Sequence, residues 1–323
     1  MKKIILLSLT AFLAVTFNAC KKDKDDNGNP NPGPTSCKLK SVKETTTETG
    51  KPDVYDGFVL HYDGDKIIRA SFVDSASGNE DSLNYILLSY NANNITDLKV
   101  YQDKDLAVNM VFDYNAENLV RRRTFDVTWE NIQMDVTQDY EYDSKGQISY
   151  SVRTMVGTVP ILGNVNIKDS AVFTGYNSFG RPAAITVFNS TTTSQGTQPY
   201  EYSEEFAYEY DANGNRTKES SKSDVADPFT VGRTATFDLN KKPGDAEHAF
   251  RVFTRLTGTG WEDPNINTKD IDNNLIISET VTDASGTTST TTTYTLNDRN
   301  SPASSTETGG ATTTTSAFTY DCK

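Results

Sequence analysis

The sequence predicts an all-β fold built from repeated β-hairpins. A short unit led by tyrosine recurs through residues 37–323, and the segments between its copies alternate apolar and polar residues, as in Ile148–Val152. That period of two is typical of strands, whereas no segment keeps the 3.6-residue period and the end caps of a helix. We expect one long, strongly curved antiparallel sheet or half-barrel, with a two-sheet sandwich as the alternative.

Residues 1–19 predict a lipoprotein signal peptide. Lys2 and Lys3 precede an apolar stretch, residues 4–15, that is too short to span a bilayer. The segment FNAC that ends at Cys20 resembles the lipobox of bacterial lipoproteins, although its first two residues depart from the strictest form. The resemblance implies that Cys20 carries acyl chains (palmitate among them), and two or more chains anchor a protein stably. An ordinary secretory signal with an incidental Cys20 is the alternative.

Residues 20–36 form the lipidated cysteine and a tether. Apart from proline, residues 21–36 contain no apolar side chain that could pack, so they cannot offset the entropy of an ordered chain. Lys24, Asp25 and Asp26 resemble the acidic surface-export signal of Bacteroidetes lipoproteins, with a merely charged linker as the alternative. The first half of a calcium loop at residues 23–28 is rejected, because Pro34 stands where the closing glutamate belongs.

The repeated unit has a mechanical interpretation. It reads aromatic or apolar, any residue, Tyr, Asp or Asn, two variable residues, then Gly or Asn. The acid or amide opens a turn by bonding its own backbone, and Gly or Asn tolerates the positive φ that closes a hairpin. Each copy therefore predicts one hairpin. The clear tyrosines are Tyr62, Tyr90, Tyr114, Tyr142, Tyr176 and Tyr210, and degenerate copies begin at Phe237, Tyr294 and Phe318.

These copies resemble the YD-repeat of the RHS family and, more closely, the YD-like repeat lipoproteins of Bacteroidetes, which are of unknown function. The resemblance covers most of residues 58–323. It implies hairpins stacked side by side in one continuous sheet, with Tyr and Phe on the covered face. Because RHS shells use far more repeats to enclose a volume, we do not expect this sheet to close.

Two further cysteines bracket the folded body of residues 37–323. With Cys20 committed to lipid, Cys37 and Cys322 remain, one at each end. An even pair in an exported protein favours a disulfide, which would hold the truncated last copy against the first strand. Two free thiols are the alternative.

Charge argues against nucleic acid as a partner. The net charge of −13 would fall by two more on loss of the signal peptide, which carries two lysines and no acid. Such a field repels phosphate backbones. The run Arg121–Arg123 is interpreted as a solvated strand face rather than a binding patch. The threonine runs at 191–193, 290–293 and 312–315 predict exposed strands or loops.

No catalytic, cofactor or metal site is predicted. The two histidines, His61 and His248, are too few for a zinc centre, and no phosphate-binding loop or nucleophile elbow occurs. His61 lies between Leu60 and Tyr62, where a solvated residue is expected. Other candidates are interpreted as solvated charges or packing residues: Glu201, Glu204, Glu205, Trp129, Trp261, Glu262 and Asp263.

Three serines match the Asp-(Ser/Thr)-apolar acceptor pattern of Bacteroidetes O-glycosylation. They are Ser75, Ser82 and Ser170. Chance matches to so short a pattern are the alternative.

The sequence favours a non-enzymatic lipoprotein of the outer membrane, lipid-anchored through Cys20 and facing the outside of the cell. A sheet rich in aromatic rings and acidic charge suits a binding or adhesive role toward glycan or protein. A half-barrel carrier of a lipid or other apolar ligand is the alternative, and a carboxylate-based hydrolase is a third hypothesis. A carrier requires a contiguous apolar cavity, whereas a binding face requires exposed aromatic rings in a row. Neither the ligand nor the oligomeric state is indicated.

Overall fold

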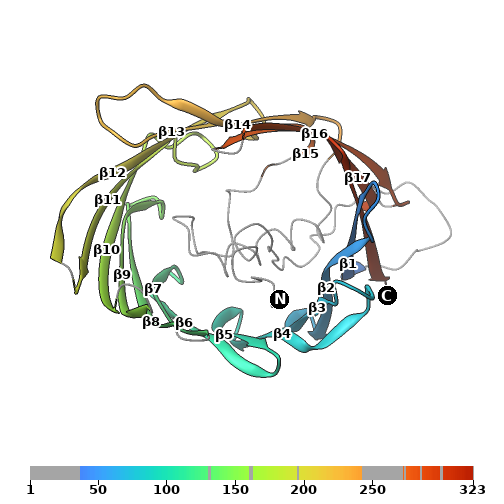
Figure 1. Cartoon of the computed structure of the whole chain (residues 1–323), viewed down its shortest axis with the longest axis horizontal. Helices are drawn as coiled ribbons and strands as arrows, with labels where there is room; N and C mark the ends of the chain where they lie inside the picture. Colours follow the sequence, from blue (N-terminus) through green and yellow to red (C-terminus); the bar gives the residue numbers. More distant parts are fainter. Residues whose placement is uncertain are drawn as a thin grey trace.

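The protein is a closed antiparallel β-barrel of 18 strands (Figure 1). The computed structural model describes residues 37–129, 132–159, 163–194, 196–241, 272, 274–283, 286–298 and 301–322. Each strand pairs with the strands before and after it in the chain, and β18 also pairs with β1. The all-β, antiparallel prediction is therefore confirmed.

The strands are β1 (Cys37–Glu48), β2 (Val54–Asp63), β3 (Lys66–Val73), β4 (Glu80–Asn91), β5 (Asn94–Gln102), β6 (Asp105–Tyr114), β7 (Val120–Trp129), β8 (Ile132–Tyr142), β9 (Ile148–Val159), β10 (Gly163–Thr174), β11 (Ala184–Thr193), β12 (Gly196–Tyr210), β13 (Arg216–Lys222), β14 (Thr230–Asp238), β15 (Leu275–Asp283), β16 (Gly286–Leu296), β17 (Pro302–Gly309) and β18 (Thr312–Cys322). The threonine runs lie in β11, β16 and β18, so they form strands as predicted.

The expectation of an open half-barrel, and the alternative of a sandwich, are wrong. β1 and β18 are hydrogen-bonded from Cys37 opposite Cys322 to Glu48 opposite Thr312, and Figure 1 shows β1 beside the C-terminus. Closure gives every strand two partners, so no edge is left exposed. The predicted disulfide is confirmed, because Cys37 and Cys322 are joined at one end of this seam.

The tyrosine-led copies form hairpin turns at one end of the barrel, as predicted. Each full copy joins an even-numbered strand to the next odd-numbered strand, and antiparallel strands place those turns at the same end. In four copies the residue four positions after the tyrosine has positive φ, at Asn118, Gly146, Gly180 and Gly214. The copies at Tyr62 and Tyr90 instead use shorter turns between β2 and β3 and between β4 and β5.

The acid or amide of the unit holds the longer turns as expected. Asp143 Oδ1 accepts hydrogen bonds from the backbone N–H groups of Lys145 and Gln147, at 2.8 and 2.9 Å. Asn177 and Asp211 accept the equivalent pairs in their own turns. Side chain and backbone therefore close the turn together, without help from the rest of the fold.

The tyrosine hydroxyl links each copy to the one before it. Tyr62 donates to the carbonyl oxygen of Leu39 at 2.7 Å, which lies near the start of the preceding odd-numbered strand. The same bond recurs from Tyr90 to Ile67, Tyr114 to Ile95, Tyr142 to Val120, Tyr176 to Ile148, Tyr210 to Pro182 and Tyr320 to Pro302. Phenylalanine could not make this contact, which explains why the unit carries tyrosine.

A β-bulge accompanies most of these units. Opposite Tyr114 the ladder passes from Arg122 to Val120, so Arg121 is an extra residue on β7. Equivalent register shifts occur beside Tyr62, Tyr90, Tyr142 and Tyr210. A bulge bends its strand and increases its twist. Repeated at one end of the sheet, the bulges supply curvature that closure requires.

The two faces of the sheet differ in burial. Phe58 and Leu60 on β2 are buried, whereas the His61 side chain is 42% exposed. Leu60 lies opposite Ala70, and Ala70 opposite Ile86, so buried residues follow one face from strand to strand. Because the described strands form a single closed layer, we assign this sheltered face to the inside of the ring. We call it the inner face, and the other the outer face.

The inner face has two sectors. Between β1 and β11 it is mainly apolar, with Leu98 and Met110 among its fully buried residues. Between β12 and β18 the strand register places polar and charged residues there instead. This polar sector includes Glu204, Glu219, Ser221, Arg233, Glu279, Thr292, Glu307 and Ser316.

Candidate ligand-binding surface

Four aromatic residues gather on the outer face over β9, β11 and β12. They are Tyr150, Phe188, Tyr200 and Tyr202, and we call them the aromatic cluster. The rings of Phe188 and Tyr200 are nearly parallel, with centroids 6.0 Å apart. Tyr202 meets Phe188 edge-on at 6.5 Å. Both arrangements are favoured by the charge distribution of aromatic rings, so the cluster is ordered by its own contacts.

Tyr200 is aimed into the cluster by an irregularity in β12. Between Asn189 and Thr191 the ladder shifts register, so that Pro199 and Tyr200 both stand opposite Ser190. Proline cannot donate to the ladder and is tolerated at such bulges, and a bulge redirects the side chains it carries. The Tyr200 side chain reaches across β11 to β10, where its hydroxyl is hydrogen-bonded to Ser170.

Tyr200 is held in place while its ring stays accessible. It is 47% exposed, and its hydroxyl is bonded to both Ser170 and Tyr150. Burial of the hydroxyl raises the pKa of Tyr200, the Ser170 contact lowers it, and the Tyr150 contact raises it again. An exposed ring that has lost its rotational freedom loses little entropy when a ligand stacks on it.

A second aromatic stack on the outer face is less available. Tyr85 and Tyr101 stack with centroids 4.8 Å apart, and the Arg69 guanidinium lies 4.1 Å from the Tyr85 centroid. β4, which carries Tyr85, lies between the strands of the other two residues. Tyr85 and Tyr101 are both half-buried, whereas Tyr200 is 47% exposed. This stack therefore offers a ligand less ring surface than Tyr200 does.

Beside the polar sector, the inner face of β1 carries a carboxyl group with an unusual titration. Burial raises the pKa of Glu44 to about 7, opposed by a hydrogen bond from the Ser316 hydroxyl at 3.1 Å. The like charges of Asp56, directly opposite on β2, and of Glu307 raise the pKa further. Glu44 therefore changes charge near neutral pH.

Arg233 neutralises part of the polar sector. Its guanidinium lies 2.8 Å from Glu219 Oε1 and contacts Glu279 on the other side. Within the described ranges, no group of three His, Cys, Asp or Glu residues is arranged to hold a metal ion. The acidic residues of the inner face are therefore not treated as a cation site.

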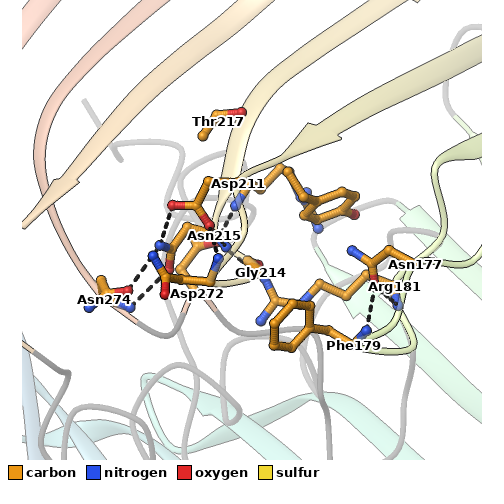
Figure 2. A network of polar contacts seen from close by, with 12 residues as sticks. Asn177, Phe179, Arg181, Asp211, Gly214, Asn215, Thr217, Asp272 and Asn274 are labelled. Atoms are coloured by element: carbon orange, nitrogen blue, oxygen red, sulfur yellow. Dashed lines mark hydrogen bonds and ion pairs between the residues drawn. The ribbon is translucent and has the colours of Figure 1, made fainter. Parts of the chain in front are cut away.

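A buried polar network joins two neighbouring turns at the tyrosine end of the barrel (Figure 2). Arg181 extends from one turn and donates to the carbonyl oxygen of Gly214 in the next. Asn215 Nδ2 donates to Asp211 Oδ2 at 2.8 Å and to Asn274 Oδ1 at 3.0 Å, while the Asn274 backbone N–H donates back to Asn215 Oδ1 at 3.0 Å. These groups bond to one another, which marks a structural clamp rather than a ligand site.

The predicted glycosylation sites fall in different environments. Ser75 and Ser82 are exposed, and their modification stays a prediction. Ser170 is 1% exposed beneath Tyr200. A hydroxyl so enclosed has no room for a sugar, so we withdraw Ser170 as an acceptor.

Several predictions fall outside the described residues. These are the lipidated Cys20, the export signal at Lys24, Asp25 and Asp26, and the candidates His248, Trp261, Glu262 and Asp263. The Trp129 side chain is not described either. In the part of the chain that is described, no helix has the length and apolar character needed to cross a membrane.

The arginine run is only partly solvated. Arg121 and Arg122 pair with Asp113 and Asp139 on the exposed side, as expected. Arg123 is 2% exposed on the inner face. The interpretation of the whole run as a solvated face is therefore wrong for Arg123, because adjacent strand residues point to opposite faces.

The remaining charged candidates behave as structural residues. His61 Nε2 lies 2.7 Å from Glu80 Oε1 on the outer face, in the solvated position predicted. Glu205 pairs with Lys222 at 3.1 Å. Glu204 lies on the inner face, where burial raises its pKa against a hydrogen bond from Ser221.

The aromatic cluster was not found from the sequence. Tyr150 follows the repeat at Tyr142, and Phe188, Tyr200 and Tyr202 belong to no clear copy of the unit. The one available signal was Pro199 within a segment of strand-forming residues, since proline there marks a bulge.

Comparison with known proteins finds distant structural likeness only. No protein-family model matches the sequence, and no curated protein matches it. A porin-like protein from Bacteroides vulgatus ATCC 8482 has a TM-score of 0.41 at 12% identity, over 88% of this chain and 99% of that chain. A porin-like protein from Bacteroides uniformis ATCC 8492 has a TM-score of 0.38 at 12% identity, over 90% and 98%. The crystal structure of TcdB2-TccC3-TEV has a TM-score of 0.33 at 11% identity, over 82% of this chain and 14% of that chain. Function must therefore be argued from the surface of this chain.

Proposed function

We propose that this protein is a non-enzymatic lipoprotein of the outer membrane, anchored through Cys20 and exposed at the cell surface, whose barrel binds glycan or protein. The anchor is supported by the signal peptide, the lipobox-like segment and the tether of residues 20–36. The YD-like repeats and the export signal at Lys24, Asp25 and Asp26 are consistent with a location at the cell surface.

The aromatic cluster is the observation that carries the binding role. A binding face needs accessible aromatic rings, and Tyr200 is both fixed and 47% exposed. Rings held in this way stack on the apolar face of a sugar or on aromatic and aliphatic side chains of a protein. The cluster lies on the outer face, where a ligand from the surroundings can reach it.

The alternative of an apolar-ligand carrier has one supporting observation, the apolar sector of the inner face. Its residues, however, are already buried, with Leu98 and Ile86 at 0% exposure. A vacant carrier site would leave part of such a lining exposed. Native mass spectrometry that finds a co-purified lipid in most molecules would favour the carrier over the binding face.

The binding role can be tested with a glycan array and a panel of surface proteins probed with the full-length chain in detergent. We expect bound partners to be lost on Tyr200→Ala. Tyr101→Ala is the matched control, since it removes an aromatic side chain from the half-buried Tyr85–Tyr101 stack on the same face. Equal binding by both variants and the unaltered protein would remove the cluster from consideration, and an absence of any partner would count against the proposal itself.

A further inference from the structure

The surroundings of the aromatic cluster point to one class of ligand. Lys168 on β10 is exposed, and its ammonium lies 5.9 Å from the centroid of the Tyr200 ring. Its cross-strand neighbours are Thr154 on β9 and Ser190 on β11, both uncharged. Hydroxyl groups therefore flank this cation on both sides.

Lys168 forms no salt bridge with an acidic residue among the described residues. On the same face Lys222 pairs with Glu205, Arg122 with Asp139, and Lys218 with Glu209. Asp169 next to Lys168 points to the inner face, where Arg153 and Asn189 bind it. The Lys168 ammonium beside the Tyr200 ring can therefore attract an anion at short range, although the net charge of the whole chain is −13.

The bulge places the acid that follows Tyr200 in the sequence on the other face as well. Glu201 follows Tyr200 but lies opposite Asn189, a residue of the inner face. On the outer face, Tyr200 therefore has the Lys168 ammonium and several hydroxyl groups as neighbours, whereas the negative charge of Asp169 acts on it from the inner face. The protein hydroxyl groups can hydrogen-bond to those of a sugar, and the tyrosine ring can stack on its C–H face. The ammonium can form an ion pair with a negatively charged substituent.

We propose that this surface binds an anionic saccharide, with a sugar ring stacked on Tyr200 and its carboxylate or sulfate at Lys168. This inference rests on the proposed binding function and names its ligand class. The acidic field of the whole chain disfavours anions at a distance, so the short-range contact with Lys168 is what selects them. Uronic acids, sialic acids and sulfated sugars share this chemistry.

The test uses the full-length chain in detergent on an array of glycans paired with and without the charged group, carboxylated and sulfated pairs included. The unaltered protein should bind the charged members about tenfold more tightly than their neutral partners. Lys168→Gln should remove that preference, so that charged and neutral members bind this variant equally. Lys99→Gln is the control, because it removes a lysine of the outer face distant from the cluster. Preference for charged members should also weaken as salt is raised.

The outcomes separate the two proposals. Equal binding of charged and neutral members, or a preference that survives Lys168→Gln, would overturn the anionic ligand while the binding function stands. Binding of charged members that is insensitive to Tyr200→Ala would also overturn it. If no glycan binds and no protein partner is found, the binding function itself fails.

Discussion

The hydroxyl of Tyr114 donates a hydrogen bond to the carbonyl oxygen of Ile95 at 2.9 Å, joining one repeat to the backbone of the previous repeat. Burial raises the pKa of Tyr114 to about 12. The hydroxyl is therefore a neutral donor at any physiological pH. Since the same hydrogen bond recurs in other copies of the unit, it links successive hairpins in a regular way.

Removing one of these hydroxyl groups should lower the free energy of unfolding measurably. Tyr114→Phe keeps the ring and leaves the Ile95 carbonyl without its donor, a loss of roughly 1–3 kcal/mol for a buried group. Equilibrium urea unfolding measures the change. Tyr101→Phe is the control, because the Tyr101 hydroxyl makes no hydrogen bond with the residues that the structure describes, and this variant should unfold like the unaltered protein. Equal unfolding midpoints for the two variants would contradict a stabilising role of the Tyr114 hydrogen bond.

Truncation to alanine should destabilise the protein much more at Arg123 than at the adjacent Arg122. Arg123→Ala removes a buried guanidinium that donates to Gln138 Oε1 at 2.7 and 3.0 Å. The variant therefore has a buried Gln138 oxygen without these two donors, and a cavity where the arginine side chain was. We expect a loss of about 3 kcal/mol or more in the free energy of unfolding. Arg122→Ala removes an exposed pair and should change stability little. Similar losses for both variants would argue against the assignment of faces.

Stability should fall as pH rises through neutrality because of Glu44. Its folded-state pKa, raised from 4.5 to about 7, makes ionisation more costly in the fold than in the unfolded chain. The stabilising contribution is complete below about pH 4.5 and is lost as pH rises through about 7. Glu44→Gln should therefore be more stable than the unaltered protein at pH 8, with the advantage shrinking toward pH 5.

Thermal or urea unfolding across pH 5–9 measures this difference. Glu141→Gln is the control, since Glu141 is exposed on the outer face. A Glu44→Gln advantage that stays constant with pH would show that packing, rather than ionisation, sets the difference.

The disulfide should stabilise the closed barrel mainly by restricting the unfolded chain. Cys37 and Cys322 are separated by 285 residues, and cross-links of long loops contribute roughly 2–5 kcal/mol. Replacing both cysteines by serine should lower the unfolding free energy by that amount. The β1–β18 hydrogen bonds should still allow the barrel to fold.

A reductant supplies the control for this prediction. It should destabilise the unaltered protein to the level of the double variant and leave the variant unchanged. Intact mass under non-reducing conditions checks the bond directly, since free thiols would make the protein 2 Da heavier than the bonded form. A reductant that acts equally on both proteins would contradict the prediction.

Local features of this protein were predictable because they depend on residues close in sequence. The turn at Asp143 is closed by its own side chain and by Gly146, four residues after Tyr142, so the unit could be read without knowledge of its neighbours. The pairing of Cys37 with Cys322 followed from elimination. These inferences need only turn chemistry, strand alternation and a count of cysteines.

The aromatic cluster could not be predicted in the same way. Tyr200 reaches Ser170 only because β12 shifts register opposite Ser190, and a shift of one residue decides which face a side chain occupies. Because burial depends on register in the same way, the burial of Arg123 and Ser170 could not be predicted either. Pro199 is a signal for a bulge, but it does not tell which way the Tyr200 ring will point.

The sequence by itself determined the hairpin, its turn and the tyrosine that begins each unit, since those are set by contacts within a few residues. The tertiary structure alone decided that 18 strands close into a barrel. Closure depends on twist and bulges summed over all strands, and no single repeat reveals that sum. The same long-range register decided which rings and charges meet on the outer face.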